Sequence, residues 1–180
     1  MKDCTELIIK ARQGDTPAFA RLVDLNRDYV YRLAFRLLMD TEQAKDVAQE
    51  TFIRVWKQLH RFQPGKRFST WIYKITVNLC YDRLRARQRF HRLFERSDST
   101  DVHIASQVDM EADLIDRERL ETVQKFVNSL SPKQRMVFVL RDLEDQDIAE
   151  IAALLGISTG AVKTHLYLAR KTIREQFQQD

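Results

Sequence analysis

Residues 145–176 constrain the fold more than any other part of the chain, because they spell out two short helices joined by a tight turn. Gly156 stands where a glycine in the left-handed conformation ends a first helix, and Ser158 is a favourable N-cap for a second. Apolar residues recur every three or four positions in both helices, at Ile148, Ile151, Ala152, Leu155, Val162, Leu166, Ala169 and Ile173. The stretch therefore predicts a helix-turn-helix.

The outer side of the second predicted helix is cationic and rich in hydrogen-bonding groups. Its polar residues are Lys163, Thr164, Tyr167, Arg170, Lys171 and Arg174. Such a face fits the major groove of DNA, where the start of the second helix reads base edges and flanking cations meet phosphates. A basic solvent face is also common on ordinary surface helices. The motif alone therefore leaves open what kind of DNA-binding protein carries it.

The rest of the chain is predicted to be helical as well. The whole chain of 180 residues has four glycines and three prolines, and its apolar residues recur at spacings of three and four positions rather than two. Ser131 and Gln134 form a capping box with Pro132 at the first helical position. Helices are expected over residues 5–12, 69–87 and 116–129, and around the apolar stripes that end at Leu37, Leu59 and Leu140.

Charge divides the chain into two parts. Residues 81–96 hold six arginines against two acids, whereas residues 97–118 hold seven acids against one base. The acidic stretch is poor in large apolar residues, which is typical of a tether. We therefore predict an all-α protein with two small helical domains, residues 1–96 and 116–180, joined by a flexible acidic linker, residues 97–115. The second domain contains the helix-turn-helix.

Several classes of function are disfavoured. Cys4 and Cys80 are isolated, so neither a disulfide framework nor a metal site is suggested, and no cofactor is expected. The four histidines are scattered and no catalytic motif appears, which argues against an enzyme. No segment is apolar for the length that a bilayer requires, so we expect no membrane insertion and a cytoplasmic location. The net charge of +4 is weak support for a polyanionic partner.

Four segments in order resemble a known family. They are D-V-A-Q-E-T-F-I-R-V-W-K at 46–57, F-S-T-W-I-Y-K-I-T-V-N at 68–78, L-S-P-K-Q-R-M-V-F-V-L-R-D-L at 130–143, and the helix-turn-helix. Together they resemble bacterial RNA polymerase sigma factors of the extracytoplasmic function (ECF) group, over nearly the whole chain. The resemblance implies a protein that binds core polymerase and promoter DNA.

The resemblance implies a polymerase-binding surface on the segment 46–57. Asp46, Gln49, Glu50, Arg54 and Lys57 correspond to the surface that grips the clamp coiled coil of the largest polymerase subunit, and the flap of the second-largest subunit is a further expected partner. A mixed acid and base surface at helical spacing suits another helix. The alternative is that these residues are merely solvated on an amphipathic helix, with Trp56 in the core.

The resemblance also implies that the loop from Phe62 to Phe68 and the following helix capture and help melt the minus-ten element. Cations, aromatic rings and an amide there suit the backbone and the unstacked bases of opened DNA. Trp71 and Asn78 each have an alternative place in the core. Arg83, Arg85, Arg87 and Arg89 correspond to a basic helix end that contacts upstream phosphates. The expected minus-ten residues are Lys66, Arg67, Trp71, Tyr73, Lys74, Asn78, Tyr81, Arg83, Arg85 and Arg87.

In the helix-turn-helix, the resemblance implies recognition of the minus-thirty-five element. By position, Lys163, Thr164 and Tyr167 are expected to contact bases, and Arg170, Lys171 and Arg174 to contact phosphates. Ser158 and Thr159 offer backbone N–H groups to a phosphate at the helix start. The acidic linker corresponds to a segment that threads through the polymerase, where its charge could imitate nucleic acid; a plain tether is the alternative.

Two further expectations concern partners and competing functions. Members of the group are commonly held inactive by an anti-sigma factor, often membrane-bound, that covers these surfaces. A stand-alone helix-turn-helix regulator is the alternative function, but it leaves residues 41–96 without a role.

Overall fold

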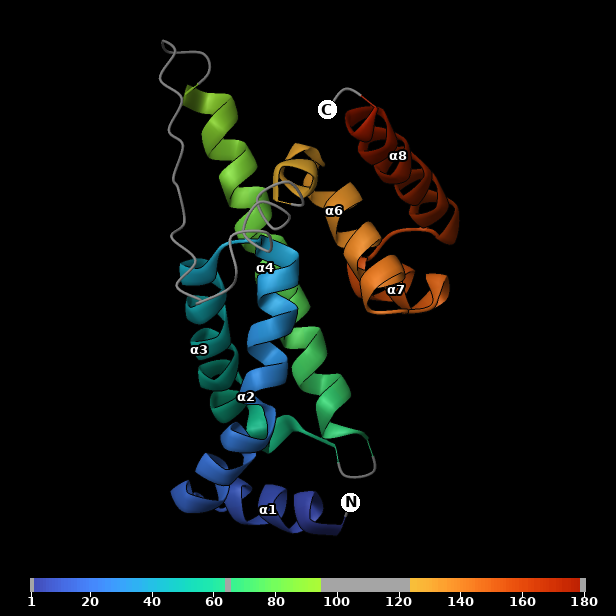
Figure 1. Ribbon diagram of the computed structural model, residues 1–180. Helices are drawn as coiled ribbons and strands as arrows, with labels where there is room; N and C mark the ends of the chain where they lie inside the picture. Colours follow the sequence, from blue (N-terminus) through green and yellow to red (C-terminus); the bar gives the residue numbers. More distant parts are fainter. Residues whose placement is uncertain (1, 64–65, 95–123, 179–180) are drawn as a thin grey trace. The chain divides into compact units, whose positions relative to one another are not determined.

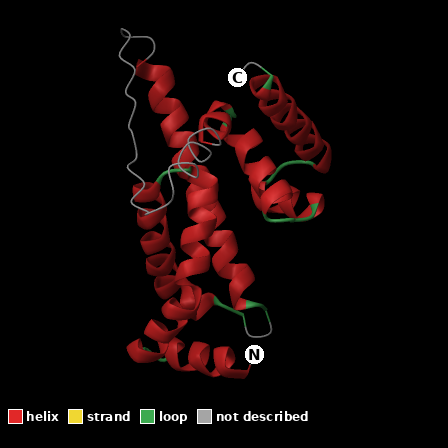
Figure 2. Ribbon diagram, in the orientation of Figure 1, coloured by secondary structure: helices red, strands yellow, loops and turns green. Residues whose placement is uncertain are grey.

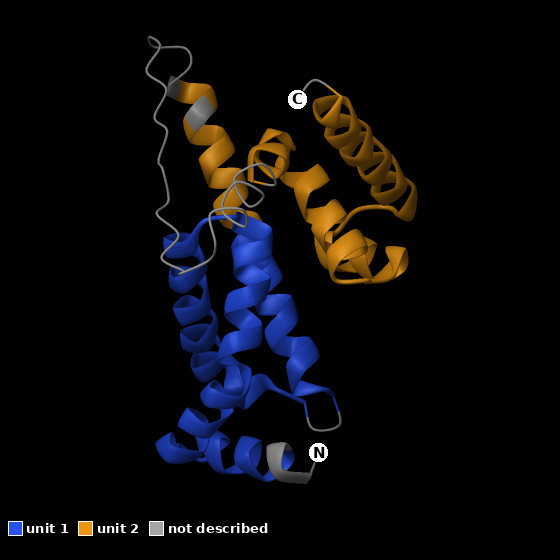
Figure 3. Cartoon of the chain, viewed as in Figure 1, with its two compact units in different colours: residues 1–80 blue, residues 81–180 orange. Residues whose placement is uncertain are grey.

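The computed structural model describes residues 2–63, 66–94 and 124–178, and every regular element in these ranges is a helix (Figures 1 and 2). The all-α prediction is confirmed. Two compact units, residues 1–80 and 81–180, divide the chain at a point inside helix α4 (Phe68–Phe94) (Figure 3). The predicted linker, residues 97–115, and the predicted boundaries beside it lie outside the described residues and stay a prediction.

The first unit is built from three helices, a short turn and the start of α4. They are α1 (Lys2–Arg12), α2 (Thr16–Leu38), α3 (Thr41–Gln58) and the 3-10 turn η1 (Leu59–Arg61). Asp15 caps α2 by accepting a 2.9 Å hydrogen bond from the backbone N–H of Ala18. Asp40 caps α3 in the same way, at 3.0 Å from the N–H of Gln43.

A buried apolar core holds this unit together. Leu22 and Val30 of α2 are buried with Val55 of α3, Leu59 of η1 and Ile72 of α4. The hydroxyl groups of Thr51 on α3 and Thr76 on α4, both fully buried, lie 3.4 Å apart. Burial of these stripes fixes which sides of α3 and α4 face solvent.

The second unit carries the helix-turn-helix. Residues 124–129 are helical, and α6 (Pro132–Phe138), η2 (Val139–Leu143), α7 (Ile148–Leu155) and α8 (Thr159–Phe177) follow. The predicted capping box is confirmed: the Ser131 hydroxyl accepts from the N–H of Gln134, and the Gln134 side-chain oxygen accepts from the N–H of Ser131 at 2.9 Å.

The segment η2 is a π-helix, which the sequence does not predict. The N–H of Glu144 donates to the carbonyl of Val139 at 3.0 Å, a wider turn than the α-helical one. Val139 and Leu140 are fully buried, and Asp145 then turns the chain with φ +50°. The wider turn keeps the apolar pair inside while it carries the chain toward α7.

The turn between α7 and α8 is as predicted. Gly156 caps α7 in the left-handed conformation, with φ +64°, and its N–H donates to the carbonyl of Ala152. The Ser158 hydroxyl caps α8 by accepting from the N–H of Ala161 at 3.1 Å. In the described part of the chain no single helix is long and apolar enough to cross a membrane; α7 and α8 reach that length and composition only as a pair bent by 102°.

The two glycines beside this turn give a matched test. A Cβ at Gly156 meets no atom within 4 Å, so Gly156→Ala is strained only by its positive φ and should lower the free energy of unfolding by about 1 kcal/mol. Gly160→Ala, whose Cβ would make an ordinary 3.8 Å contact with Ser158, should raise it by about 0.5 kcal/mol. Chemical denaturation followed by circular dichroism measures both; equal effects of one sign would contradict the assigned turn.

Candidate nucleic-acid and protein interfaces

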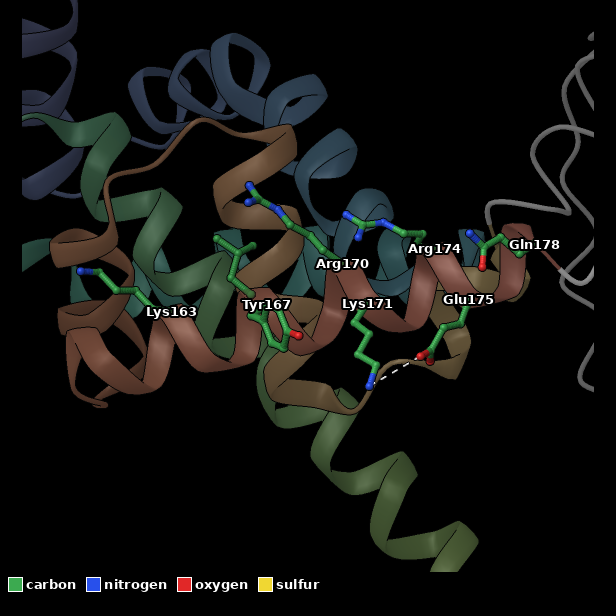
Figure 4. Close-up of a pocket in the computed structure, with 8 residues that line it drawn as sticks. Lys163, Tyr167, Arg170, Lys171, Arg174, Glu175 and Gln178 are labelled. Atoms are coloured by element: carbon green, nitrogen blue, oxygen red, sulfur yellow. Dashed lines mark ion pairs between the residues drawn. The ribbon is translucent and has the colours of Figure 1, made fainter.

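The solvent-facing side of α8 presents the residues that the sequence assigns to the upstream DNA element. Tyr167 keeps 67% of its surface exposed, while Val162 and Ala169 on the opposite side are fully buried. An open groove runs along the exposed side, and Figure 4 shows the side chains that line it. They are Lys163, Leu166, Tyr167, Arg170, Lys171, Arg174, Glu175 and Gln178. The buried back therefore presents these polar groups on a rigid support.

The start of α8 is also exposed. Ser158 and Thr159 face solvent, and Ser158 satisfies one N–H of the first turn, that of Ala161. The Thr164 hydroxyl donates to the carbonyl of Gly160 at 3.1 Å. The first-turn N–H groups of a helix carry its positive dipole end, so this terminus suits a phosphate.

The cations of α8 differ in their partners. The Arg170 guanidinium forms two hydrogen bonds with the Asp142 carboxylate of η2, at 2.9 and 2.6 Å. Lys171 lies 3.6 Å from Glu175, and both side chains are more than half exposed, so this ion pair is weak. Among the described residues, Lys163 and Arg174 pair with no acid. Those two cations are therefore the readiest to meet a polyanion.

His165, which the sequence reading did not assign, lies on the half-buried edge of α8. Burial, and secondarily the positive charge of Lys133, lowers the pKa of His165 below its usual value. The imidazole is therefore neutral at pH 7 and does not add to the positive charge of the helix.

Helix α4 places one line of polar residues along a single face. They are spaced by three or four positions, so they share a side of a continuous helix. All are exposed except Tyr81, which is half-buried with the Arg85 guanidinium 5.6 Å from its ring centroid. The polar line consists of Lys74, Asn78, Tyr81, Arg85, Arg89 and Arg92. Arg83 and Arg87 are half-buried and fall on the opposite side by the same spacing.

Two of the predicted minus-ten residues need reassessment. Tyr73 is only 8% exposed and its ring stacks against Tyr29, with centroids 6.5 Å apart, so assigning it to a DNA base is corrected: it is a core residue. Trp71 is half-buried and packs against Phe62 and Phe68 at 5.2 and 5.9 Å. Asn78, in contrast, is exposed, so its alternative place in the core is excluded.

The loop before α4 is anchored at both ends by aromatic rings. Phe62 and Phe68 are buried and meet edge to face at 5.5 Å. Lys66 and Arg67, between them, are exposed. The predicted turn at Pro64 and Gly65 lies outside the described residues. The anchored rings hold two cations at the start of α4.

The outer face of α3 combines charge with exposed apolar surface. Asp46, Gln49 and Lys57 are exposed, and the half-buried Glu50 and Arg54 form a 2.6 Å ion pair. Two apolar residues join this face, and the sequence reading assigned neither to it. They are Ile53, which is 46% exposed, and Trp56, which is 38% exposed and packs on Phe19 at 4.7 Å. An exposed apolar centre with a charged rim is typical of a protein-binding surface.

Known proteins are similar to this chain over nearly its whole length. Residues 22–90 match the Sigma-70 region 2 family and residues 120–173 match the Sigma-70 region 4 family. The chain is 34% identical to the ECF RNA polymerase sigma factor SigW of Bacillus subtilis, over 95% of this chain and 97% of that protein. It is 35% identical to the ECF sigma factor SigE of Mycolicibacterium smegmatis, over 91% of this chain and 63% of that protein.

Solved structures share the fold. CnrH, solved in complex with the cytosolic domain of CnrY, is 24% identical, with a TM-score of 0.64 over 99% of both chains. The sigma factor RpoE of Bartonella quintana, solved with the anti-sigma factor NepR, is 23% identical, with a TM-score of 0.63 over 90% of this chain and 98% of that one.

Replacing Tyr73 and Asn78 separates core from surface on α4. Tyr73→Ala removes a buried ring and should lower the free energy of unfolding by about 3 kcal/mol. Asn78→Ala changes an exposed side chain and should alter it by less than about 0.5 kcal/mol. Urea denaturation followed by the fluorescence of Trp56 and Trp71 measures both. Comparable losses for the two variants would show that Asn78 is a core residue.

Proposed function

The chain belongs to the ECF group of RNA polymerase sigma factors, and from this membership we propose that it directs core polymerase to promoters with two recognition elements. The family consists of transcription initiation factors rather than enzymes. The observation that carries the proposal is the exposed cationic face of α8 above its buried apolar back. The proposed domains are residues 1–96 and 116–180, with 97–115 as the linker.

The proposed upstream contacts lie on α8. Lys163, Thr164 and Tyr167 are in the N-terminal half of α8, where a recognition helix meets base edges. Lys171 and Arg174 follow on the same exposed side and suit phosphates, as do the N–H groups beside Ser158 and Thr159. Arg170 stands apart, because Asp142 already holds its guanidinium.

The proposed downstream contacts follow the polar line of α4. Lys66 and Arg67 lie at the start of the helix, and Lys74, Asn78 and Tyr81 continue along it. Cations that follow a DNA backbone, with an amide and a ring for unstacked bases, suit opened DNA. Arg85 and Arg89 extend the line toward duplex phosphates. Arg83 and Arg87 lie on the opposite side, so their proposed contribution is limited to the general positive charge of the helix.

The outer face of α3 is the proposed polymerase surface. Asp46, Gln49, Glu50, Arg54 and Lys57 supply its polar rim, and Ile53 adds an apolar centre. A helical partner such as the clamp coiled coil could bury Ile53 while its charges match the rim. The flap of the second-largest subunit is the proposed partner of the second domain.

An anti-sigma factor is a further proposed partner. The sigma factor RpoE of Bartonella quintana, which shares this fold, was solved in complex with the anti-sigma factor NepR. The exposed apolar residues of this chain suit a protein that covers it. Its proposed binding partners, core polymerase and chromosomal DNA, are in the cytoplasm. We therefore propose that the protein acts there.

A stand-alone regulator remains the second candidate function, since helix-turn-helix segments end many such proteins. It does not account for the surfaces of α3 and α4, which a DNA-binding domain alone would not need. Dependence on core polymerase distinguishes the two.

Run-off transcription tests the proposed function. Purified core polymerase with this protein should start transcripts at promoters from its own regulon, and neither component alone should do so. Genome-wide crosslinking supplies the promoter fragments. Transcription that does not respond to the protein across all these fragments would refute the proposal.

Substitutions on α8 test the upstream contacts. Lys163→Ala and Tyr167→Ala should each weaken binding to the preferred upstream element by about 1–3 kcal/mol, because each removes a proposed base contact. Holoenzyme binding to duplexes with single base changes measures the effect, and Gln178→Ala, at the far end of the groove, serves as the control. Equal weakening on every sequence would show that the two side chains contact only phosphate.

A further inference from the structure

The pair of Asp142 and Arg170 joins two elements that are distant in sequence. Asp142 lies in the π-helix η2 and Arg170 on α8, 28 positions later. Nε of Arg170 donates to Oδ2 of Asp142 at 2.9 Å, and Nη2 donates to Oδ1 at 2.6 Å. Two parallel hydrogen bonds between planar groups fix the relative orientation of the two side chains as well as the distance between them.

Asp142 is the anchored partner of this pair. Its side chain is 22% exposed, against 52% for Arg170. The backbone around it is fixed by the fully buried Val139 and Leu140 and by a 2.9 Å hydrogen bond from the N–H of Gln146 to the carbonyl of Leu140. A carboxylate on so constrained a segment is a fixed reference point for the helix that binds it.

Apolar side chains pack the middle of α8 against its own unit. Val162, Leu166 and Ala169 are buried, which decides the side of α8 that faces the core, but the hydrophobic effect is non-directional and does not by itself fix the exact rotation of the helix about its axis. Near the end of α8, the Ser129 hydroxyl lies 3.1 Å from the Gln176 side-chain oxygen. In the described part of the chain, this ion pair is therefore the directional contact between α8 and another element that lies nearest to Tyr167, a residue one helical turn before Arg170.

The pair also changes what Arg170 can do. A guanidinium that gives two hydrogen bonds to a carboxylate has its charge balanced within the protein, and leaving Asp142 would break both charge-assisted hydrogen bonds. Phosphate binding by Arg170 has to compete with that pair. Lys171 and Arg174 face no comparable competition.

We propose that Asp142 is a positioning residue for promoter recognition. Through Arg170 it sets the rotation of α8 about its axis, so that Lys163 and Tyr167 meet the upstream element in one orientation, and it withholds Arg170 from the DNA phosphates. The inference rests on the proposed function, because it assigns α8 to that element.

The test uses the full chain assembled with core polymerase. The probes are a promoter duplex mapped with the wild-type holoenzyme and the same duplex with its upstream element scrambled. Binding to both is measured over a range of salt concentrations for Asp142→Asn, Arg170→Ala and Arg170→Asp, and for the double variant Asp142→Arg with Arg170→Asp. Asp145→Asn is the matched control, since Asp145 is 98% exposed and lies 3.6 Å from Arg141. Circular dichroism verifies the folding of each variant.

Asp142→Asn should reduce the preference for the intact promoter about three- to tenfold, because α8 loses its fixed rotation. On the scrambled duplex, the slope of the log binding constant against the log salt concentration should become about one unit steeper, because the freed Arg170 contacts a phosphate. Arg170→Ala should leave the slope unchanged, and the double variant should recover most of the preference lost in Arg170→Asp. Asp145→Asn should behave as wild type.

Three results would overturn the inference. The first is an unchanged preference in Asp142→Asn. The second is a salt-dependence slope that becomes shallower by about 0.9 in Arg170→Ala, because that change would show that Arg170 contacts a phosphate. The third is a folded double variant no better than Arg170→Asp. A wild-type holoenzyme that does not distinguish the two probes would instead refute the proposed function, and the inference with it.

Discussion

The burial of Val162 and Ala169 on one side of α8 is the interaction on which the proposed DNA-facing surface depends. Both side chains are fully buried, so the opposite side of the helix has to face solvent, and the polar groups there are held in one arrangement. The left-handed Gly156 and the Ser158 cap bring α8 back across α7 at a bend of 102°. The proposed base recognition therefore rests on apolar packing and on a turn, and in our proposal Asp142 and Arg170 fix the orientation of the helix.

In the first unit, too, a buried apolar core decides which helix faces are exposed, but the exposed side chains are of different kinds. The core around Leu22, Val55 and Ile72 turns one face of α3 and one face of α4 outward. The face of α3 combines charge with exposed Ile53, which suits a protein partner, whereas that of α4 presents exposed Lys74 and Asn78, which suit nucleic acid. A sigma factor has to bind polymerase and DNA together, and two helices on one core provide separate surfaces for the two partners.

Much of this fold follows from local sequence signals, because caps and turns depend on neighbouring residues. Gly156, Ser158, Ser131 and the apolar stripes were predictable for that reason. The burial of Tyr73 and the exposure of Asn78 were not predictable. The pattern of apolar and polar residues in their helix does not show which side faces the core. The pairing of Asp142 with Arg170 could not be predicted either. The two residues are 28 positions apart, and their contact depends on a π-helical turn that no residue pattern indicates.

The central claim is that one chain holds two separate DNA-reading surfaces. Hydroxyl-radical footprinting of the holoenzyme on a mapped promoter tests it most directly. The wild type should protect an upstream and a downstream segment, and a variant with both Lys163→Ala and Tyr167→Ala should lose the upstream protection while keeping the downstream one in the presence of polymerase. A single protected segment, or the loss of both together in a folded and polymerase-bound variant, would contradict the claim.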